Sequence, residues 1–378
     1  MSPFRWSAPV GIIDLQWRTL DLELASPLVT SADRFEHRRV LVLRVKTEIA
    51  GEQHVGYGEI SPLRGWSEES VEDCEAMLAS LADRLATVEP MTLLEVHRLV
   101  DLPALCFGLE LACLDAVARH LGCPLRALWA PDSTPCPDAV DVQYTLGAAS
   151  IKETLKKARS AVEQGFSCLK IKVGATSASV DIERISEVRR ACPDVVIRLD
   201  ANGAFEVDEA RFFLDNLAGL GVDLVEQPVA FDDLDGLAKL STHSAIDIAA
   251  DESCIPRRQR RRLLDERIVD GLVLKPMALG GLLATRELIE EAAGRDMRVV
   301  LSTLIESAIA RRSIAQLAAA CPEVRGAQGL ATGSWFATDL APEKDRIVEG
   351  QLVLSDRPGL GFVPHHRSKT LWASRGRI

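Results

Sequence analysis

The first third of the chain carries the hydrophobic pattern of strands followed by two helices. Three segments rich in Val, Ile and Leu are separated by short polar breaks and predict strands: residues 10–24, 38–48 and 54–60. Ser67 or Ser70 then offers an N-cap for a helix that runs to about residue 88. A second stretch with helical apolar spacing runs from Phe107 to His120. Together these segments predict a small α+β unit.

From about residue 140 the pattern changes to short apolar strands that alternate with helical stretches. The predicted strands are Val140–Leu146, Leu169–Val173, Val195–Ala201, Asp223–Pro228, Asp247–Glu252, Leu272–Pro276, Val299–Thr303 and Ala327–Leu330. From the second onward they begin about 24 to 28 residues apart, which is the length of one strand–helix unit and favours parallel strands. Eight such units close a barrel. An open doubly wound sheet is the alternative, but no glycine-rich phosphate turn follows the first strand.

Composition narrows the class of protein and its partners. The chain has 378 residues, 47% of them hydrophobic, and a net charge of −11, which argues against nucleic acid or an anionic membrane as a partner. Its nine cysteines are odd in number and form no close CxxC pair, and no signal segment is recognisable, so we expect reduced thiols in the cytoplasm. No apolar run is long enough to span a bilayer. The seven histidines show no HxxxH spacing, so we do not expect a zinc site.

Lysines and carboxylates stand on one face of the predicted barrel strands. In LKIKVG the side chains alternate, so Lys170 and Lys172 point into the barrel while the apolar residues meet the helices. The next three strands end in Asp200, Glu226 and Asp251. Each alone could cap the helix that follows. Together, at the same point of three consecutive units, they place three carboxylates side by side at the carboxyl end of the barrel.

Three converging carboxylates repel one another unless a cation lies between them. Oxygen ligands, one from each strand, suit Mg²⁺, and Mn²⁺ could substitute. Lys275, at the end of LVLKP, faces this site from the side opposite Lys172. A divalent ion flanked by lysines suits removal of a proton next to a carboxylate, because the ion neutralises the second negative charge as it develops. The positive charges of Lys170 and the metal would favour the neutral form of Lys172, which a base requires.

The motifs KIK, DANG, EQP, ADES and LKP occur in this order at residues 170–172, 200–203, 226–228, 250–253 and 274–276. As a set they resemble the enolase superfamily, in particular its muconate-lactonising-enzyme subgroup. The resemblance implies a modified TIM (β/α)7β barrel with an N-terminal α+β capping domain. We expect the capping domain at 1–135, the barrel at 136–340 and a C-terminal segment, 341–378, that returns to the capping domain.

By the same resemblance each site residue has an expected role. Asp200, Glu226 and Asp251 are expected to bind the metal, Lys172 is the general base, and Lys275 faces it; Asn202 and Glu252 would support these residues. No histidine stands in LSTLIES on the seventh strand, so a histidine base of the mandelate-racemase type is not supported.

Further motifs are similar to those of the o-succinylbenzoate synthase family. These are GYGEISPLRGWSEES at 56–70, CFGLELA at 106–112, STLIES at 302–307 and QGLAT at 328–332. Arg64, Trp66 and Gln328 depart from the residues usual there, which bears on the shape of the pocket. The resemblance implies dehydration of 2-succinyl-6-hydroxy-2,4-cyclohexadiene-1-carboxylate to o-succinylbenzoate in menaquinone biosynthesis. The partner is then a small carboxylate substrate; the sequence does not predict the oligomeric state.

Alternatives within the subgroup are an N-acylamino acid racemase or dipeptide epimerase, and a muconate cycloisomerase. The segment GLATGSW lacks the acidic residues that would hold the ammonium group of a dipeptide. A Schiff-base aldolase barrel would not need three carboxylates, and a scaffold without activity would not need both lysines. Four residues are candidates for substrate binding: Ser302, Thr303, Gly281, whose turn could present backbone N–H groups, and Trp66, which could cover the pocket.

Overall fold

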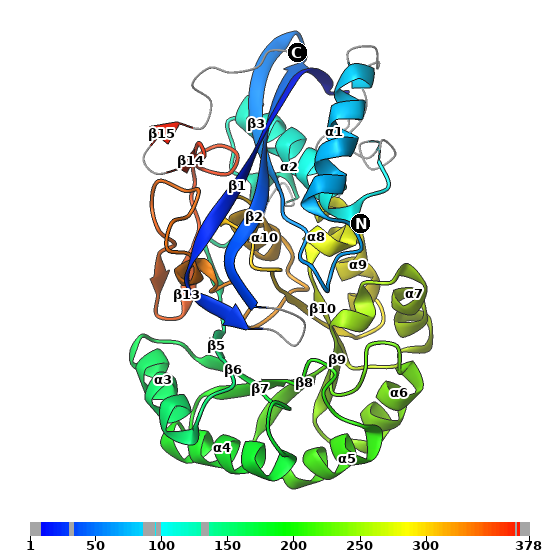
Figure 1. The fold of residues 1–378 in the computed structure, drawn as a ribbon, viewed down its shortest axis with the longest axis vertical. Helices are drawn as coiled ribbons and strands as arrows, with labels where there is room; N and C mark the ends of the chain where they lie inside the picture. The colour runs from blue at the N-terminus through cyan, green and yellow to red at the C-terminus, as the bar shows by residue number, and fades with distance from the viewer. Residues whose placement is uncertain are drawn as a thin grey trace.

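The computed structural model describes residues 9–29, 34–85, 95, 100–129, 136–366 and 369–370. Figure 1 shows two bodies, one above the other: a twisted sheet with two helices, and a curved array of strands with helices around its outer side. The first and last described strands lie in the upper part of the view, so the lower body is built from the middle of the chain.

The upper body is based on a three-stranded antiparallel sheet with β2 in the middle. Its strands are β1 (Gly11–Val29), β2 (Arg34–Ile49) and β3 (Glu52–Ile60). The three strands predicted in this part of the chain are therefore present; β1 extends beyond its predicted end, β3 begins before its predicted start, and β2 is longer at both ends.

Two helices accompany this sheet, α1 (Val71–Leu85) and α2 (Pro103–His120). Ser70 caps α1, because its hydroxyl accepts from the Asp73 N–H at 3.1 Å while the Asp73 carboxylate accepts from the Ser70 N–H at 2.9 Å. The predicted end of this helix at about residue 88 lies outside the described residues. In contrast to the amphipathic α1, helix α2 is buried on every side from Ala104 to Ala118.

Helix α2 lies unusually close to β3, and glycine makes this approach possible. A Cβ atom on Gly56 would lie 1.9 Å from the backbone oxygen of Ala112, and one on Gly58 would lie 2.0 Å from that of Gly108. Any side chain at these positions would push α2 away from the sheet. The glycines of the GYGEIS motif thus fix the position of α2.

The lower body is a parallel sheet of seven strands whose spatial order follows the sequence. The strands are β5 (Tyr144–Leu146), β6 (Cys168–Lys172), β7 (Val196–Asp200), β8 (Val222–Glu226), β9 (Asp247–Ala250), β10 (Gly271–Leu274) and β11 (Arg298–Leu301). The helices of this body are α3 (Ile151–Glu163), α4 (Ala178–Ala191), α5 (Val207–Asn216), α6 (Leu234–His243), α7 (Arg257–Glu266), α8 (Pro276–Leu279), α9 (Leu282–Ala293) and α10 (Ala308–Ala320). Short 3-10 helices in the described part of the chain include η2 (Leu125–Leu128), η3 (Glu252–Cys254) and η4 (Gly333–Trp335).

A very short eighth element closes the barrel between β11 and β5. The predicted strand at 327–330 consists of two single parallel bridges, in which Gln328 pairs with Val142 and Gly329 with Ser302. The predicted strand Val140–Leu146 is also divided. Its first part, β4 (Ala139–Asp141), pairs with the C-terminal β13. Only its second part, β5, belongs to the barrel sheet. The architecture confirms the expected (β/α)7β barrel with an α+β cap.

Side chains alternate along the barrel strands as predicted. Ile197 and Leu199 of β7 belong to the large core that lies between strands and helices. A separate cluster fills the barrel interior and consists of Leu224, Ala249, Val273 and Val300, one from each of four adjacent strands. Residues two positions further along a strand than this layer therefore lie at the carboxyl end of the barrel.

Carboxylates of the cap complete the N-termini of two barrel helices. The Glu59 carboxylate of β3 accepts from the Ser307 and Ala310 N–H groups at the start of α10, at 2.9 and 3.1 Å. The Glu110 carboxylate of α2 accepts from the Leu282 and Leu283 N–H groups at the start of α9. These bonds satisfy helix donors that would otherwise have no partner.

The C-terminal segment contacts both bodies. Strands β12 (Ile347–Val348) and β13 (Gln351–Val353) form a hairpin beside β4, and β14 (His365–His366) pairs with β15 (Lys369–Thr370). Between these hairpins the Leu360 N–H donates to Asp115 and the Phe362 carbonyl accepts from Arg119, both on α2. Domain bounds at residues 135 and 340 stay a prediction.

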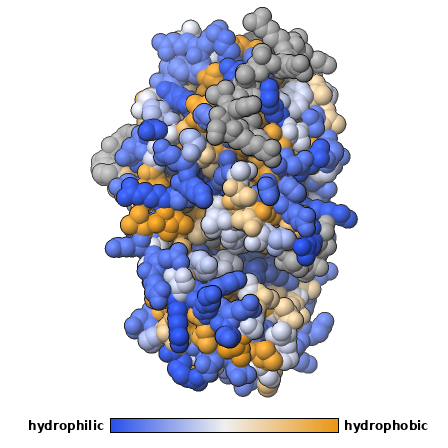
Figure 2. Space-filling model, turned by 60° about the vertical axis from the view of Figure 1, so that its left-hand side comes forward, coloured by the Kyte–Doolittle hydropathy of each residue, from blue (hydrophilic) through white to orange (hydrophobic). Residues whose placement is uncertain are grey.

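The face of the molecule in Figure 2 is mostly hydrophilic, with hydrophobic residues in scattered small groups. Among the described residues, no helix combines the length and the apolar character needed to cross a membrane. All nine cysteines lie in the described ranges, and none of them forms a disulfide.

Candidate active site

Three carboxylates lie where strands β7, β8 and β9 end. Asp200 is the last residue of β7 and Glu226 the last of β8, and the two are paired in the parallel ladder. Asp251 follows β9 directly. The exposed fractions of these residues are 1%, 3% and 2%. The structure therefore brings together the acidic residues that the strand pattern indicated.

Two lysines of β6 neutralise part of this charge. The Lys170 Nζ donates to both carboxylate oxygens of Glu226, at 2.7 and 2.8 Å, and lies 2.7 Å from Asp200 Oδ2. The Lys172 Nζ lies 2.6 Å from the same Asp200 oxygen. The Lys170 side chain is 9% exposed and that of Lys172 is 34% exposed. Lys172 is therefore the lysine of the pair that a ligand can reach.

The third lysine approaches from the other side of the barrel. Lys275 follows β10, and its Nζ donates to both oxygens of Asp251 at 2.5 Å. In the spatial order of the sheet, the three carboxylate-bearing strands β7, β8 and β9 lie between β6 and β10. Lys172 and Lys275 thus flank the carboxylates, as the sequence indicated.

Because this group is buried, each charge in it depends on opposite charges nearby for its stabilisation. Burial opposes the charged form of Lys170, but the carboxylates of Asp200, Glu226 and Asp251 hold the pKa of this lysine above its usual value. Burial likewise opposes ionisation of Asp200, yet Lys170 and Lys172 hold the pKa of this carboxyl below its usual range. For Glu226, burial and the repulsion of the neighbouring Asp200 raise the pKa. The charge of Lys170 is thus balanced by carboxylates, which differs from the expected role of Lys170 in repelling a proton from Lys172.

Asn202 and Glu252 lie next to this group and form a chain of hydrogen bonds. The Lys172 Nζ donates to Asn202 Oδ1 at 2.5 Å, and Asn202 Nδ2 donates to Glu252 Oε1 at 2.9 Å. Asn202 has a φ of 44°, a left-handed conformation that asparagine tolerates better than most residues. In this conformation its N–H donates to Asp200 Oδ1 at 3.2 Å. These contacts orient both Lys172 and the carboxylate beside it.

Gln227 is a site residue that the sequence reasoning missed. It is fully buried, and its Oε1 accepts from the N–H groups of Asp251 and Ser253, at 3.0 and 3.2 Å. Its φ is 43°, so a strained backbone directs this side chain from the end of β8 to the end of β9. Gln227 therefore positions Asp251. The EQP motif contained this residue, but no pattern in the sequence gave it a partner.

Trp66 reaches the barrel from the loop between β3 and α1. The Lys275 Nζ lies 3.6 Å from the centroid of the Trp66 ring, which is the geometry of a cation–π contact. The cap thus supplies an aromatic surface directly over one of the two flanking lysines. That Trp66 covers a substrate pocket stays a prediction.

Ser302 and Thr303 stand directly after β11 and are 8% and 7% exposed. The Thr303 hydroxyl lies 3.3 Å from the hydroxyl of Thr332, and Ser302 bridges Gly329 in the short eighth element. These contacts close the barrel, and a contact with substrate stays a prediction. The Gln328 side chain is also structural, because its Oε1 accepts from the Leu301 N–H at 2.7 Å.

Gly281 is not brought to the carboxylates in the way that the sequence suggested. Its N–H donates to the Pro276 carbonyl at 3.1 Å, so this N–H is already used within the turn. A Cβ atom on Gly281 would lie 2.5 Å from the Glu110 carboxylate. Glycine is therefore required here for the contact between α2 and α9, which corrects the interpretation of this turn as a carboxylate-binding site.

The donor set fits a hard divalent cation. Asp200, Glu226 and Asp251 offer only oxygen atoms, from three adjacent strands and on the same inward face. Although lysines contact all three, burial and repulsion by Asp200 raise the pKa of Glu226, and burial and repulsion by Glu252 raise that of Asp251. The group therefore has capacity for more positive charge. The residues present therefore suit Mg²⁺ better than a softer metal.

Comparison with known proteins agrees with this geometry. Residues 153–368 match the model of the enolase C-terminal domain-like family, and residues 17–116 match the N-terminal domain of MenC. A hydrophobic dipeptide epimerase of Citrifermentans bemidjiense is 30% identical over 90% of this chain and 94% of its own. Muconate cycloisomerase 1 of Rhodococcus opacus is 27% identical over 96% of this chain and 98% of its own.

A solved structure resembles the whole molecule. The dipeptide epimerase of Enterococcus faecalis, complexed with Mg and the dipeptide L-Leu-L-Tyr, has a TM-score of 0.84 and 25% identity, and the match covers 94% of this chain and 100% of that one. Fold, strand-end residues and family match agree, and the chain therefore belongs to the enolase superfamily.

Proposed function

We propose that the chain is an o-succinylbenzoate synthase, which dehydrates 2-succinyl-6-hydroxy-2,4-cyclohexadiene-1-carboxylate. The observation that carries this proposal is the match of residues 17–116 to the MenC N-terminal domain. That part of the chain contains the loop that holds Trp66 over Lys275, and in this proposal the loop would face the substrate.

In this proposal Lys172 is the general base. It is the exposed lysine of the β6 pair, and Asp200 and Asn202 orient its Nζ atom. In its neutral form it would take the proton from the ring carbon that bears the carboxylate. The C–H electron pair then forms the new ring double bond as the hydroxyl leaves, and Lys172 returns the proton so that water is lost. The ring becomes aromatic, with no oxidant needed.

Lys275 and Lys170 have electrostatic roles. Asp251 holds the Lys275 Nζ atom, and the Trp66 ring covers it. From this position Lys275 would stabilise the negative charge that develops on the substrate carboxylate. Lys170 is bound to Glu226 and Asp200 and would keep these carboxylates in place. Its role is therefore to position other groups.

Asp200, Glu226 and Asp251 would hold Mg²⁺, with Mn²⁺ as a substitute. When bound there, the ion would supply the charge that makes a carbon acid next to a carboxylate reactive. The E. faecalis relative was crystallised with Mg, which supports this assignment.

A second candidate function is dipeptide epimerisation, favoured by the names of several relatives. Lysines on both sides of the carboxylates would suit it, because one could remove a proton and the other return it from the opposite face. The segment 328–335, however, contains no acidic residue that could hold an ammonium group. The two aspartates that follow it, Asp339 and Asp345, are bound to Arg311. N-acylamino acid racemisation does not require such a group, so it is the closer rival; muconate cycloisomerisation is a further one.

A direct assay separates these functions. The purified chain with Mg²⁺ is given the cyclohexadiene carboxylate, a panel of dipeptides, N-succinylamino acids and cis,cis-muconate. We expect rapid formation of o-succinylbenzoate, which is measured by its ultraviolet absorbance. The proposal fails if the dehydration is no faster than without enzyme while a dipeptide or N-succinylamino acid exchanges its α-proton with deuterated solvent.

A further inference from the structure

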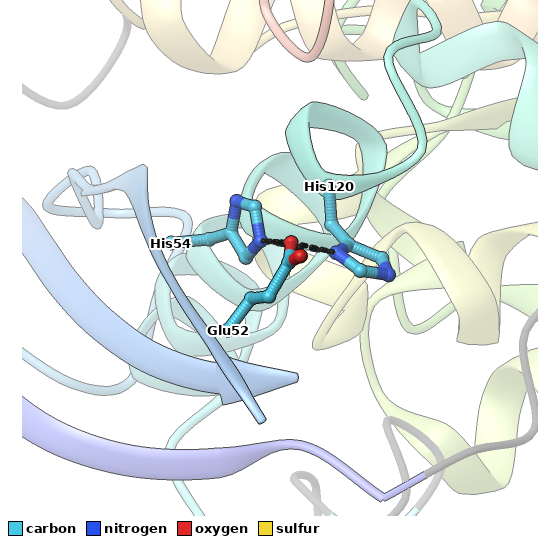
Figure 3. A group of neighbouring side chains, drawn as sticks. All are labelled: Glu52, His54 and His120. Atoms are coloured by element: carbon cyan, nitrogen blue, oxygen red, sulfur yellow. Dashed lines mark hydrogen bonds and ion pairs between the residues drawn. The ribbon is translucent and has the colours of Figure 1, made fainter. Parts of the chain in front are cut away.

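Three metal-binding side chains meet in the capping domain, in a different body from the barrel site. Glu52 and His54 belong to β3, and His120 is the last residue of α2. Figure 3 shows the Glu52 carboxylate between the two imidazole rings, with a ring nitrogen of each directed toward it. The two histidines are separated by 66 positions in the sequence, so no local spacing motif indicated this group.

The distances in this group match those around a small metal ion. The His54 Nε2 and His120 Nδ1 atoms are 3.0 Å apart, and Glu52 Oε2 lies 3.4 Å from the first and 3.6 Å from the second. Ligand atoms bound tetrahedrally to one zinc ion at about 2.1 Å lie about 3.4 Å from one another. Without a metal, the three distances require a hydrogen bond between the rings and separate ion pairs with Glu52, whereas one bound ion accounts for all three together.

Local structure accounts for this convergence. Glu52 and His54 are two positions apart on a strand, so their side chains lie on the same face of the sheet. The residues before them, Ala50 and Gly51, have positive φ angles and turn the chain tightly into β3. Gly56, further along β3, allows α2 to lie close enough for its last residue to reach this face. The rings of His54 and His120 then meet edge to face, with centroids 4.8 Å apart.

We propose that Glu52, His54 and His120 form a binding site for a divalent transition-metal ion, with Zn²⁺ as the best fit. Two imidazole nitrogens and one carboxylate oxygen are ligands that zinc prefers, and they differ from the all-oxygen set at the barrel. The histidine side chains are 20% and 19% exposed and that of Glu52 is 70% exposed, so an ion can enter from solvent and keep a water molecule as fourth ligand.

Such an ion would join the β2–β3 hairpin to the end of α2. Its role would be structural or regulatory for the cap, because the substrate-facing loop with Trp66 follows the other end of β3. The inference stands independently of the proposed function, and its test needs no turnover measurement.

The test measures Zn²⁺ and Co²⁺ binding to the untagged full chain in excess Mg²⁺, which would fill the barrel site. Titration calorimetry should show one Zn²⁺ bound per chain, and Co²⁺ should give the visible absorption of a tetrahedral nitrogen–oxygen site. His54→Ala and His120→Ala should each weaken Zn²⁺ binding by about tenfold or more. Zn²⁺ should also raise the melting temperature of the wild type and not that of these variants.

Two further variants make the result decisive. Glu52→Gln removes a largely exposed side chain, so it tests the site without threatening the fold, and it should weaken Zn²⁺ binding as well. His243→Ala is the matched control, because His243 lies on α6 and contacts only Asp215 among the interactions described for it; it should bind Zn²⁺ as the wild type does. The proposal is wrong if the wild type in excess Mg²⁺ binds no Zn²⁺, or if all four variants bind it equally.

Discussion

The mouth of the barrel and the cap above it contribute to one site in opposite ways. The barrel supplies its groups by repetition, since one acidic or basic residue stands at the end of each of five adjacent strands, from Lys172 on β6 to Lys275 after β10. The cap supplies a single residue from a loop, Trp66, which lies over Lys275. The residues proposed to carry out the chemistry therefore come from the regularly repeated strand ends of the barrel. The residue proposed to shape the pocket comes from an irregular loop of the cap.

Removing the metal proposed for the barrel site should have the largest effect on activity. Treatment with excess EDTA should abolish dehydration, because three buried carboxylates and the substrate carboxylate would face one another without a dication. Adding excess Mg²⁺ should restore the rate, which the absorbance assay measures. Full turnover in the presence of the chelator would remove the proposed role of the carboxylates as metal ligands.

Lys172→Ala should lower kcat by about 10²–10⁴-fold, the usual contribution of a general base. Circular dichroism should show an unchanged fold, since the Lys172 side chain is 34% exposed. Lys239→Ala, at an exposed position of α6, is the control and should keep the wild-type rate. A variant at position 172 that retained full activity would show that another group removes the proton.

Glu306 lies at the boundary of barrel and cap. Glu306→Gln should change how the free energy of unfolding depends on pH. Glu306 is fully buried, and this burial raises the pKa of its carboxyl to about 7 from 4.5. Between these values the unfolded chain releases a proton that the folded chain keeps, so rising pH destabilises the wild type. The effect at this residue amounts to about 3 kcal/mol and is complete above pH 7.

Urea unfolding at pH 5 and pH 8 measures this effect. The variant should lose less stability than the wild type over this interval, while Glu209→Gln on the exposed face of α5 should behave as the wild type does. Equal losses in all three proteins would show that Glu306 is ionised in the folded chain throughout this range.

Trp66→Leu should have the smallest effect and should act on the cap. Loss of a cation–π contact of about 0.5–2 kcal/mol predicts a roughly 2- to 30-fold fall in kcat/KM. Trp17→Leu, another tryptophan of the cap, removes the bond from its Nε1 to Glu75 and should leave kcat/KM unchanged. If both variants lose activity equally, Trp66 acts through the stability of the cap.

The strand-end residues could be predicted because, in a parallel sheet, the order of the strands and the position of a residue along its strand determine its neighbours. Side chains alternate, and all strands end at the same edge, so Asp200, Glu226 and Asp251 had to be neighbours once the strands were recognised. The eighth strand was harder, because its two bridges at Gln328 and Gly329 leave almost no periodic pattern.

Contacts between the two bodies were beyond such reasoning. Gly281 looked like a free turn, although it lies against Glu110, a residue 171 positions earlier. The approach of His120 to His54 likewise depends on how α2 packs on β3, which no spacing rule encodes. Gln227 belongs to a recognised motif, but its partners at the end of β9 depend on its unusual backbone angle.

The carboxylates of Glu59 and Glu110 have a consequence for the evolution of the two bodies. Each completes the start of a helix that belongs to the other body. A cap transplanted from a relative would expose the first turns of α9 and α10 unless it carried acidic residues at both places. Cap and barrel are therefore expected to be inherited as a pair, and chimeras that ignore these two positions should fold poorly even when both parents are stable.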